Sequence, residues 1–177
     1  FEMLGKNNET IRGSAKVRQA LAMSLDKNAV QQVVFAGAGF PKWTFVGSTS
    51  WAYEDVPGYD YDPEGAKALL AEEGASDLEF TVLCIQGYPD GERAATIWQA
   101  GLAEAGVKLN IEVQELSVWL DNYLNHTYDV IWNVFPGFAD PNYFVSFGLS
   151  PHLGDGWTNE TARDLAVRTN QVIDQAE

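Results

Sequence analysis

The sequence predicts an α/β fold built from a mostly parallel sheet flanked by helices. Three segments have the alternation and apolar content of strands, and they cover residues 77–84, 107–114 and 128–134. Segments with helical spacing separate these strands, and the links between neighbouring elements are short. Strands that alternate with helices in this way pair in parallel, because each helix carries the chain back along the sheet.

The amino-terminal part of the chain is predicted to hold two helices. Ser14 is expected to cap a helix that reaches Leu25, since a serine oxygen can accept a hydrogen bond from a free amide of the first turn. Asp26 is expected to cap the second helix, which Gly37 and Gly39 end. The apolar stripe of this second helix is predicted to consist of Val30, Val33 and Val34.

A long connection over residues 40–61 is rich in glycine, proline, serine and aromatic residues. Its length is unusual for a plain link and is typical of a functional loop. The sequence Asp62-Pro63-Glu64 then predicts the start of a third helix, with a capping aspartate, a proline at the first helical position and an acid in the first turn. This helix is expected to stop at Gly74.

Four further helical segments are predicted in the second half of the chain. Asp90 is expected to cap the first of them, which runs to Ala105 and is closed by Gly106. The others are a short helix at 115–124, a helical turn or two at 142–149 and a final helix at 158–175. Residues 1–177 are expected to form one domain, and both ends of the sequence favour a piece of a longer protein.

Composition argues against several classes of partner. The chain has 11 basic and 25 acidic residues and a formal net charge of −14, so its surface should repel nucleic acid and anionic membranes. No apolar run approaches the roughly 20 residues that span a bilayer. The single cysteine, Cys84, excludes an internal disulfide and a cysteine-based zinc cluster.

Two motif-like stretches have simpler structural interpretations. Gly37-Ala38-Gly39 resembles part of a dinucleotide loop, but Lys42 stands where the third glycine belongs and a helix precedes the pair. The stretch Asp60-x-Asp62-x-Glu64-Gly65 begins like a calcium loop, but its twelfth position is Ala71. We therefore expect a helix end and a helix cap, with no metal and no cofactor.

Catalysis is not expected from this sequence. Cys84 with His126 or His152 would be the pairing to consider for a nucleophile and its base. However, Cys84 occupies an apolar strand position, and the chain contains neither G-x-S-x-G nor H-E-x-x-H. The triplets that begin at Asn8, Asn125 and Asn159 are formal glycosylation acceptors, and Asn159 is better explained as a helix cap.

Aromatic residues are concentrated in two places. Five lie in the long loop, namely Trp43, Trp51, Tyr53, Tyr59 and Tyr61. Six more surround the end of the third strand, namely Trp132, Phe135, Phe138, Tyr143, Phe144 and Phe147. Loops at the carboxyl ends of parallel strands are where α/β sheets bind ligands, so these rings are candidates for the wall of an organic-ligand site. Ordinary packing is the alternative for any one of them.

Several longer stretches together resemble a known family. They are VRQALAMSLDKNAVQQVVFAGAGFP (17–41), WAYEDVPGYDYDPEGAKALLAEEG (51–74), LEFTVLC, IWQAGLAEAGVKLNIEV, YDVIWNVFPGFADPNYF and the Gly156-Trp157 pair. In this order they resemble the second lobe of family 5 extracytoplasmic solute-binding proteins, the peptide-, nickel- and oligopeptide-binding receptors of ABC importers. The resemblance implies a lobe of the type II periplasmic-binding-protein fold.

The resemblance also implies a function and partners. The chain is expected to be the C-terminal lobe of a bilobed receptor that captures a small organic solute, of the oligopeptide type, for a membrane permease. It would lack the N-terminal lobe and would work in the periplasm or at the outer membrane face, with a lipid anchor in some members. An oligosaccharide receptor of the same family and a sensory ligand-binding domain are the alternatives.

The residues expected to bind the solute follow the third strand. They are Asn133, Phe135, Gly137 and Phe138, with Trp43 and Trp51 from the long loop. In peptide-binding relatives this segment carries an aromatic residue and, three positions later, an aspartate that holds the peptide ammonium. Here Phe135 matches the aromatic, but Phe138 occupies the aspartate position. This difference favours an uncharged or ring-shaped solute.

Overall fold

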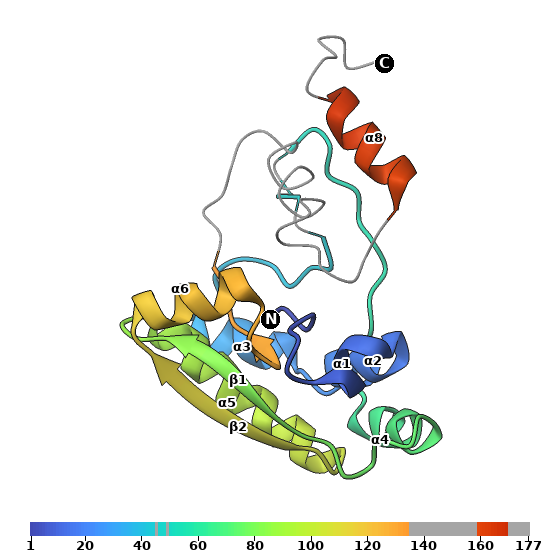
Figure 1. Cartoon of the computed structure of the whole chain (residues 1–177), viewed down its shortest axis with the longest axis vertical. Coiled ribbons are helices and arrows are strands. Elements are labelled where there is room, and N and C mark those ends of the chain that lie inside the picture. Colours follow the sequence, from blue (N-terminus) through green and yellow to red (C-terminus); the bar gives the residue numbers. More distant parts are fainter. Residues whose placement is uncertain (45, 49, 135–158, 170–177) are drawn as a thin grey trace. The chain divides into compact units, whose positions relative to one another are not determined.

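The structure of the protein is a computed structural model that describes residues 1–44, 46–48, 50–134 and 159–169 (Figure 1). The chain divides into two compact units. The larger unit comprises Phe1–Pro41 and Gly58–Val134, and the smaller comprises Lys42–Pro57 and Phe135–Glu177.

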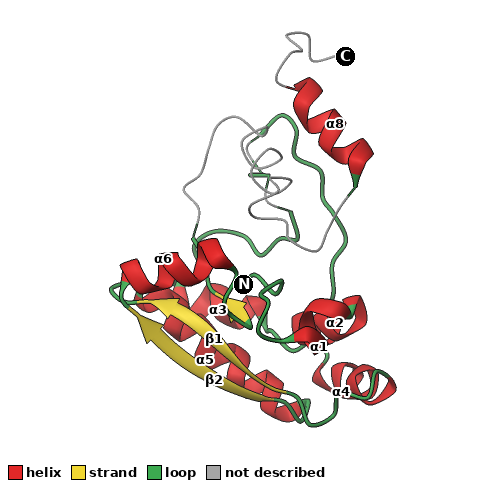
Figure 2. Ribbon diagram, viewed as in Figure 1, coloured by secondary structure: helices red, strands yellow, loops and turns green. Residues whose placement is uncertain are grey.

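The larger unit is built on a three-stranded parallel sheet, which confirms the predicted fold class. The strands are β1 (Glu79–Ile85), β2 (Lys108–Gln114) and β3 (Val130–Ile131), in the spatial order β2-β1-β3 (Figure 2). β1 pairs with β2 along its whole length and with β3 over two residues. The amino-terminal segment adds an antiparallel bridge beyond β3, between Glu2 and Ile131.

The third strand is much shorter than predicted. Residues 128–134 were expected to form it, but only Val130 and Ile131 pair with β1. Before them, the Asp129 carboxylate accepts a hydrogen bond from the Thr81 amide at 2.8 Å. The Asp129 side chain therefore bonds the Thr81 amide in place of a backbone carbonyl, and the ladder between β1 and β3 is not extended there. Strand periodicity does not reveal this competition between a side chain and the backbone.

Six helices accompany the sheet in the described part of the larger unit. They are α1 (Glu9–Gly13), α2 (Ala15–Met23), α3 (Lys27–Val34), α4 (Pro63–Glu72), α5 (Pro89–Glu104) and α6 (Leu116–Asn125). Three predicted caps are confirmed: Ser14, Asp26 and Asp62 accept hydrogen bonds from amides three residues on, at 3.2, 2.9 and 2.9 Å. The short α1, capped by Asn8, was not predicted.

Two details of the helix predictions are wrong. Asp90 does not cap α5 but is its second residue, because Pro89 takes the first helical position and Tyr88 precedes it. Proline suits that position since its φ is already helical and it has no amide to leave unpaired. In α3 no side chain is buried, and Val33 of the expected apolar stripe is 67% exposed.

The main core lies against one face of the sheet. Alternation directs Phe80, Val82 and Cys84 of β1 to this face, where α5 covers them. The core also includes Ile11, Leu21, Leu70, Trp98 and Leu102. The opposite face receives Leu83 and Ile85, and α6 packs on it.

Among the described residues, no helix is long and apolar enough to cross a membrane.

The smaller unit contributes a loop and a helix to the described residues. The loop over 42–57 has no helix or strand in its described positions, as predicted. The helix α8 (Glu160–Thr169) confirms the central part of the predicted final helix, and Asn159 caps it by accepting from the Ala162 amide at 3.0 Å. The turn expected at 142–149 and the last residues of the final helix lie outside the described residues.

Candidate functional site

The carboxyl edge of the sheet is the place where its topology favours a ligand. The chain leaves β1 through α5 to reach β2, and then crosses through α6 to β3 on the other side of β1. Right-handed crossovers in opposite directions place the two helices on opposite faces of the sheet (Figure 2). The loops after β1 and β2 therefore lead to opposite faces of the sheet, and such a divergence at the carboxyl ends is where α/β sheets form a binding crevice.

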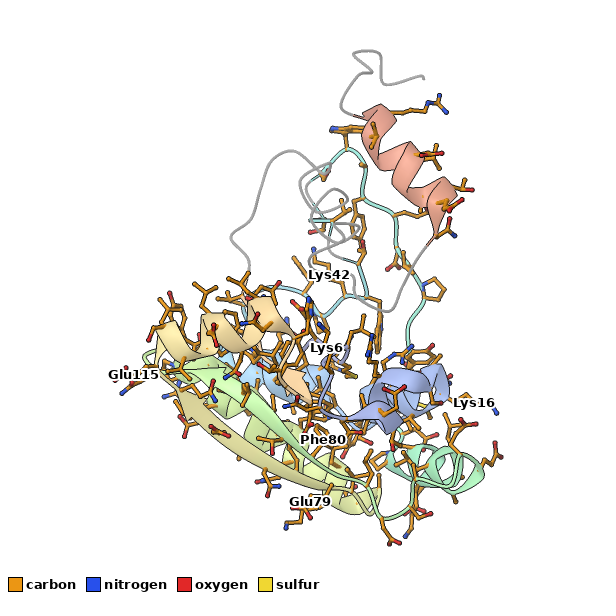
Figure 3. All side chains as sticks on the ribbon, viewed as in Figure 1. Lys6, Lys16, Lys42, Glu79, Phe80 and Glu115 are labelled. Atoms are coloured by element: carbon orange, nitrogen blue, oxygen red, sulfur yellow. The ribbon has the colours of Figure 1, made fainter. Side chains whose placement is uncertain are left out.

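Figure 3 shows the two ends of the sheet by labelled side chains. Glu79 marks the amino end, where its carboxylate pairs with Lys108 at 2.7 Å and accepts from Asn110 at 2.9 Å. Glu115 marks the carboxyl end, directly after β2. The amino end is thus closed by its own ion pair, whereas the first residues beyond the carboxyl ends present aromatic, amide and acidic groups.

Two aromatic side chains meet at the carboxyl edge. Tyr88 follows β1 and Trp132 follows β3, and their ring centroids are 6.2 Å apart with planes inclined by 50°. The Trp132 amide donates to the Leu83 carbonyl at 2.8 Å, which fixes the backbone of Trp132 beside β1. Tyr88 is 49% exposed, so its ring is available to a ligand. Tilted rings at such a distance suit contact with an organic solute.

Gly91 explains how Trp132 lies so close to α5. A Cβ atom at position 91 would stand 2.5 Å from Cδ2 of the Trp132 ring. The indole therefore covers the first turn of α5 at a residue that has no side chain. We expect Gly91→Ala to displace Trp132 and to destabilise the protein by about 1–2 kcal/mol, the cost of overpacking less the helix propensity gained.

Near-ultraviolet circular dichroism and urea unfolding of Gly91→Ala test this arrangement. The aromatic signal should change along with the free energy of unfolding. An unchanged spectrum with raised stability would show that the indole does not rest on Gly91.

Asn133 is the one predicted ligand residue that lies in the larger unit and is described. Its Nδ2 donates to Glu2 Oε1 at 3.1 Å, and its Oδ1 accepts from the Val134 amide at 2.8 Å. Burial raises the pKa of the Glu2 carboxyl, and the Asn133 amide works against that shift. Asn133 is thus held by one bond to a side chain and one to the backbone.

The predicted tryptophans of the loop belong to the smaller unit. Trp51 is 68% exposed, whereas Trp43 is half-buried. Beside Trp43, the Lys42 ammonium lies 5.6 Å from the centroid of the Tyr53 ring and donates to the Val46 carbonyl at 3.3 Å. The loop is thus held by contacts of its own. Phe135, Gly137 and Phe138 lie outside the described residues.

Sequence reasoning missed Tyr88. The signal was present, because Tyr88 comes four residues after the predicted strand at 77–84 and three residues after β1. Asn133 likewise lies two residues after β3. The predicted aromatic residues of the site lie instead in the long loop and around the end of the third strand. Trp132 was noticed among those aromatic residues but not as the partner of Tyr88.

The residues considered for a nucleophile and its base are not brought together by the described part of the structure. Cys84 is buried, and burial raises the pKa of its thiol to about 11, with a smaller contribution from the Glu92 carboxylate. His126 is buried at the end of α6 in a left-handed conformation, φ 58°. In the described part of the chain no group of three histidine, cysteine or acidic residues could hold a metal ion. His152 lies outside it.

Cys84 should consequently react slowly with alkylating reagents. At pH 7.5 we expect iodoacetamide to modify the native protein on the order of 100-fold more slowly than the urea-unfolded protein, because the thiolate is the reactive form and burial suppresses it. Mass spectrometry of the labelled protein gives both rates. Equal rates would mean that Cys84 is accessible and activated.

The sheet, its carboxyl edge and the order of the elements can be compared with known proteins. Residues 3–153 match the family model of bacterial extracellular solute-binding proteins, family 5 Middle. The chain belongs to this family. The match covers all three strands and the residues that follow them.

Two relatives and one solved structure illustrate the family 5 likeness. The dipeptide-binding protein of Escherichia coli K12 is 37% identical over 59% of this chain, and heme-binding protein A of Haemophilus influenzae is 39% identical over 61%. The chain spans about a fifth of the length of these relatives, 21% and 20%. A dipeptide-binding protein of Pseudoalteromonas sp. SM9913 in complex with Met-Leu superposes with a TM-score of 0.80 at 26% identity, over 93% of this chain and 35% of that one.

Proposed function

We propose that this family 5 chain is a ligand-binding lobe of an ABC-importer receptor that captures a small organic solute of the oligopeptide type. The observation that carries the proposal is the pair formed by Tyr88 and Trp132 at the carboxyl edge of a parallel sheet. Membership of the family supports it, since two of the three similar proteins named above are called dipeptide-binding.

The whole chain, residues 1–177, would form the C-terminal lobe of a longer, bilobed receptor. An N-terminal lobe would supply the other wall of the site, and a membrane permease would receive the loaded receptor. The periplasm or the outer face of the cytoplasmic membrane is the proposed setting. Nucleic acid is not a proposed partner, in keeping with the net charge of −14.

Ligand binding would proceed by closure of the two lobes. A solute that touches both lobes offsets the free energy of closing them, so the closed form becomes populated only with solute present. In this lobe we assign the contacts to Tyr88 and Asn133 together with Phe135, Gly137, Phe138, Trp43 and Trp51. Aromatic side chains dominate this set, which suits the apolar or ring-bearing parts of a solute better than a carboxylate.

The same aromatic set supports an alternative ligand class. Oligosaccharides stack their ring faces on tyrosine and tryptophan, and the relatives named above differ in ligand, one being called heme-binding. A sensory role for the same lobe remains a second alternative. Both alternatives keep the proposed binding residues. The first changes the class of solute, and the second changes the partner that detects the loaded lobe.

Thermal-shift screening of the full-length protein tests the proposed function. The panel comprises Met-Leu, longer peptides, heme, oligosaccharides and nickel–histidine complexes. A true ligand at 100 times its dissociation constant should stabilise the protein by about 2.7 kcal/mol, which is readily visible. A peptide response supports the proposal, a response to oligosaccharide alone selects the alternative, and silence across the panel contradicts both.

Tyr88→Ala should weaken binding of the responding compound about tenfold, because it removes half of the aromatic pair. Tyr88→Phe, which keeps the ring, should remain within about twofold of the unmodified protein. Isothermal titration calorimetry measures both affinities, and Phe35→Ala is the control for loss of an exposed aromatic ring elsewhere. Equal affinities for the Tyr88→Ala and Tyr88→Phe proteins would remove Tyr88 from the site.

A further inference from the structure

The amino-terminal segment is fastened to the end of β3 by its backbone. The Glu2 amide donates to the Ile131 carbonyl at 2.8 Å, and the Ile131 amide donates to the Glu2 carbonyl at 3.0 Å. These two bonds make Glu2 and Ile131 a directly opposed antiparallel pair. Residues paired in this way project their side chains to the same face of a sheet.

The side chains of Glu2 and Asn133 lie on the same face and are in contact. Side chains alternate along an extended chain, so Asn133 projects to the same face as Ile131, two residues earlier. The observed contact agrees, with Asn133 Nδ2 donating to Glu2 Oε1 at 3.1 Å. The residues meet across 131 positions of sequence, which makes the contact a tertiary one.

The Glu2–Asn133 contact has a buried polar neighbour on α6. Tyr123 is only 6% exposed, and its hydroxyl makes no hydrogen bond of good geometry to the described residues. It nevertheless lies close enough to Glu2 and Asn133 for both to affect its pKa, which burial raises. In such a setting a carboxylate is poorly solvated, so its bond to the Asn133 amide is stronger than one at the surface.

Besides its bond to Glu2, the Asn133 side chain makes a hydrogen bond to the backbone of the next residue. Its Oδ1 accepts from the Val134 amide at 2.8 Å. A side-chain oxygen bonded to the next backbone amide fixes the local direction of the chain. Glu2, Asn133 and Val134 thus form a continuous series of hydrogen bonds that includes Asn133, a residue of the proposed solute site.

We infer that Glu2 is a positioning residue for the solute site: its carboxylate orients the Asn133 side chain, which in turn fixes the Val134 amide. The inference rests on the proposed function for its effect on binding. Its effect on the backbone does not, because the orientation of Val134 exists with or without a solute. If Glu2 only stabilised the fold, its removal would instead loosen the sheet as a whole.

Hydrogen exchange in the full-length protein separates these two roles without a ligand. Glu2→Ala should speed exchange of the Val134 amide at least fivefold and leave the Ile111 amide of β2 unchanged. Glu2→Gln keeps an acceptor oxygen and should retain the original rate. Glu72→Ala, at an exposed glutamate on α4, is the matched control. Equal acceleration at Val134 and Ile111, or none at Val134, would overturn the inference.

Binding of Met-Leu, the dipeptide of the solved relative, is the second measurement. The affinity of the Glu2→Ala protein should fall about tenfold, and that of the Glu2→Gln protein should stay within about twofold. An unchanged affinity in Glu2→Ala would overturn the effect on the site. If the unmodified protein binds nothing in the panel, the proposed function fails, and the exchange rates alone decide the role of Glu2.

Discussion

Trp98→Ala is expected to lower the free energy of unfolding by about 3–5 kcal/mol. Trp98 is fully buried at the centre of the main core, where its ring lies 5.5 Å from that of Phe80 in an edge-on arrangement. Its Nε1 also donates to the Leu21 carbonyl of α2 at 2.8 Å. Truncation would open a cavity between α5 and the sheet and leave that carbonyl without its partner.

Urea unfolding followed by far-ultraviolet circular dichroism measures the loss. Trp98→Phe keeps most of the ring volume and loses the indole hydrogen bond, so a smaller cost of about 1–2 kcal/mol is expected. Trp51→Ala, at a tryptophan 68% exposed, should change stability little. A Trp98→Ala protein as stable as the Trp98→Phe protein would mean that the core closes around the gap.

Gly101→Ala is the second large effect, with an expected loss of about 2–3 kcal/mol. Gly101 lies buried in α5, and a Cβ atom there would stand 2.1 Å from the Ser24 carbonyl oxygen. The obstacle is backbone, so it cannot swing aside as a flexible side chain would. Overpacking therefore outweighs the roughly 1 kcal/mol that alanine gains over glycine in a helix.

Gly13→Ala is the matched control for Gly101. Gly13 is the exposed last residue of α1, where a Cβ atom would meet nothing closer than 3.5 Å. This change should leave stability unchanged or raise it slightly. Thermal unfolding of both proteins gives the comparison, and a Gly101→Ala protein as stable as the Gly13→Ala protein would show that α5 and the end of α2 are not in close contact.

Local signals in the sequence were enough for most elements. Asp62-Pro63 predicted the start of α4, and Asp26 predicted that of α3, because a cap is made within three residues. Alternation predicted β1 and β2 for a similar reason, since it directs apolar residues such as Phe80 and Leu109 to the core. Asp90 was misassigned because two start signals overlapped, and the proline decided between them.

The candidate site was only partly predictable. Its place at the carboxyl ends of parallel strands followed from the order of the elements, and Asn133 was named on that basis. Tyr88 was not, because nothing near it in the sequence pairs it with Trp132. Their approach depends on the register of β3 beside β1 and on the missing side chain of Gly91, two facts that belong to distant parts of the chain.

By itself, the sequence determined the fold class, the starts of α2, α3 and α4, and the membership of family 5. These depend on periodicity, capping and local motifs, which are properties of neighbouring residues. Only the tertiary structure decided that β3 pairs over two residues, that Asp129 ends its ladder, and that Glu2 meets Asn133. In each case, groups from distant parts of the chain compete to form a hydrogen bond with the same backbone or side-chain amide. Local sequence does not show which of them succeeds.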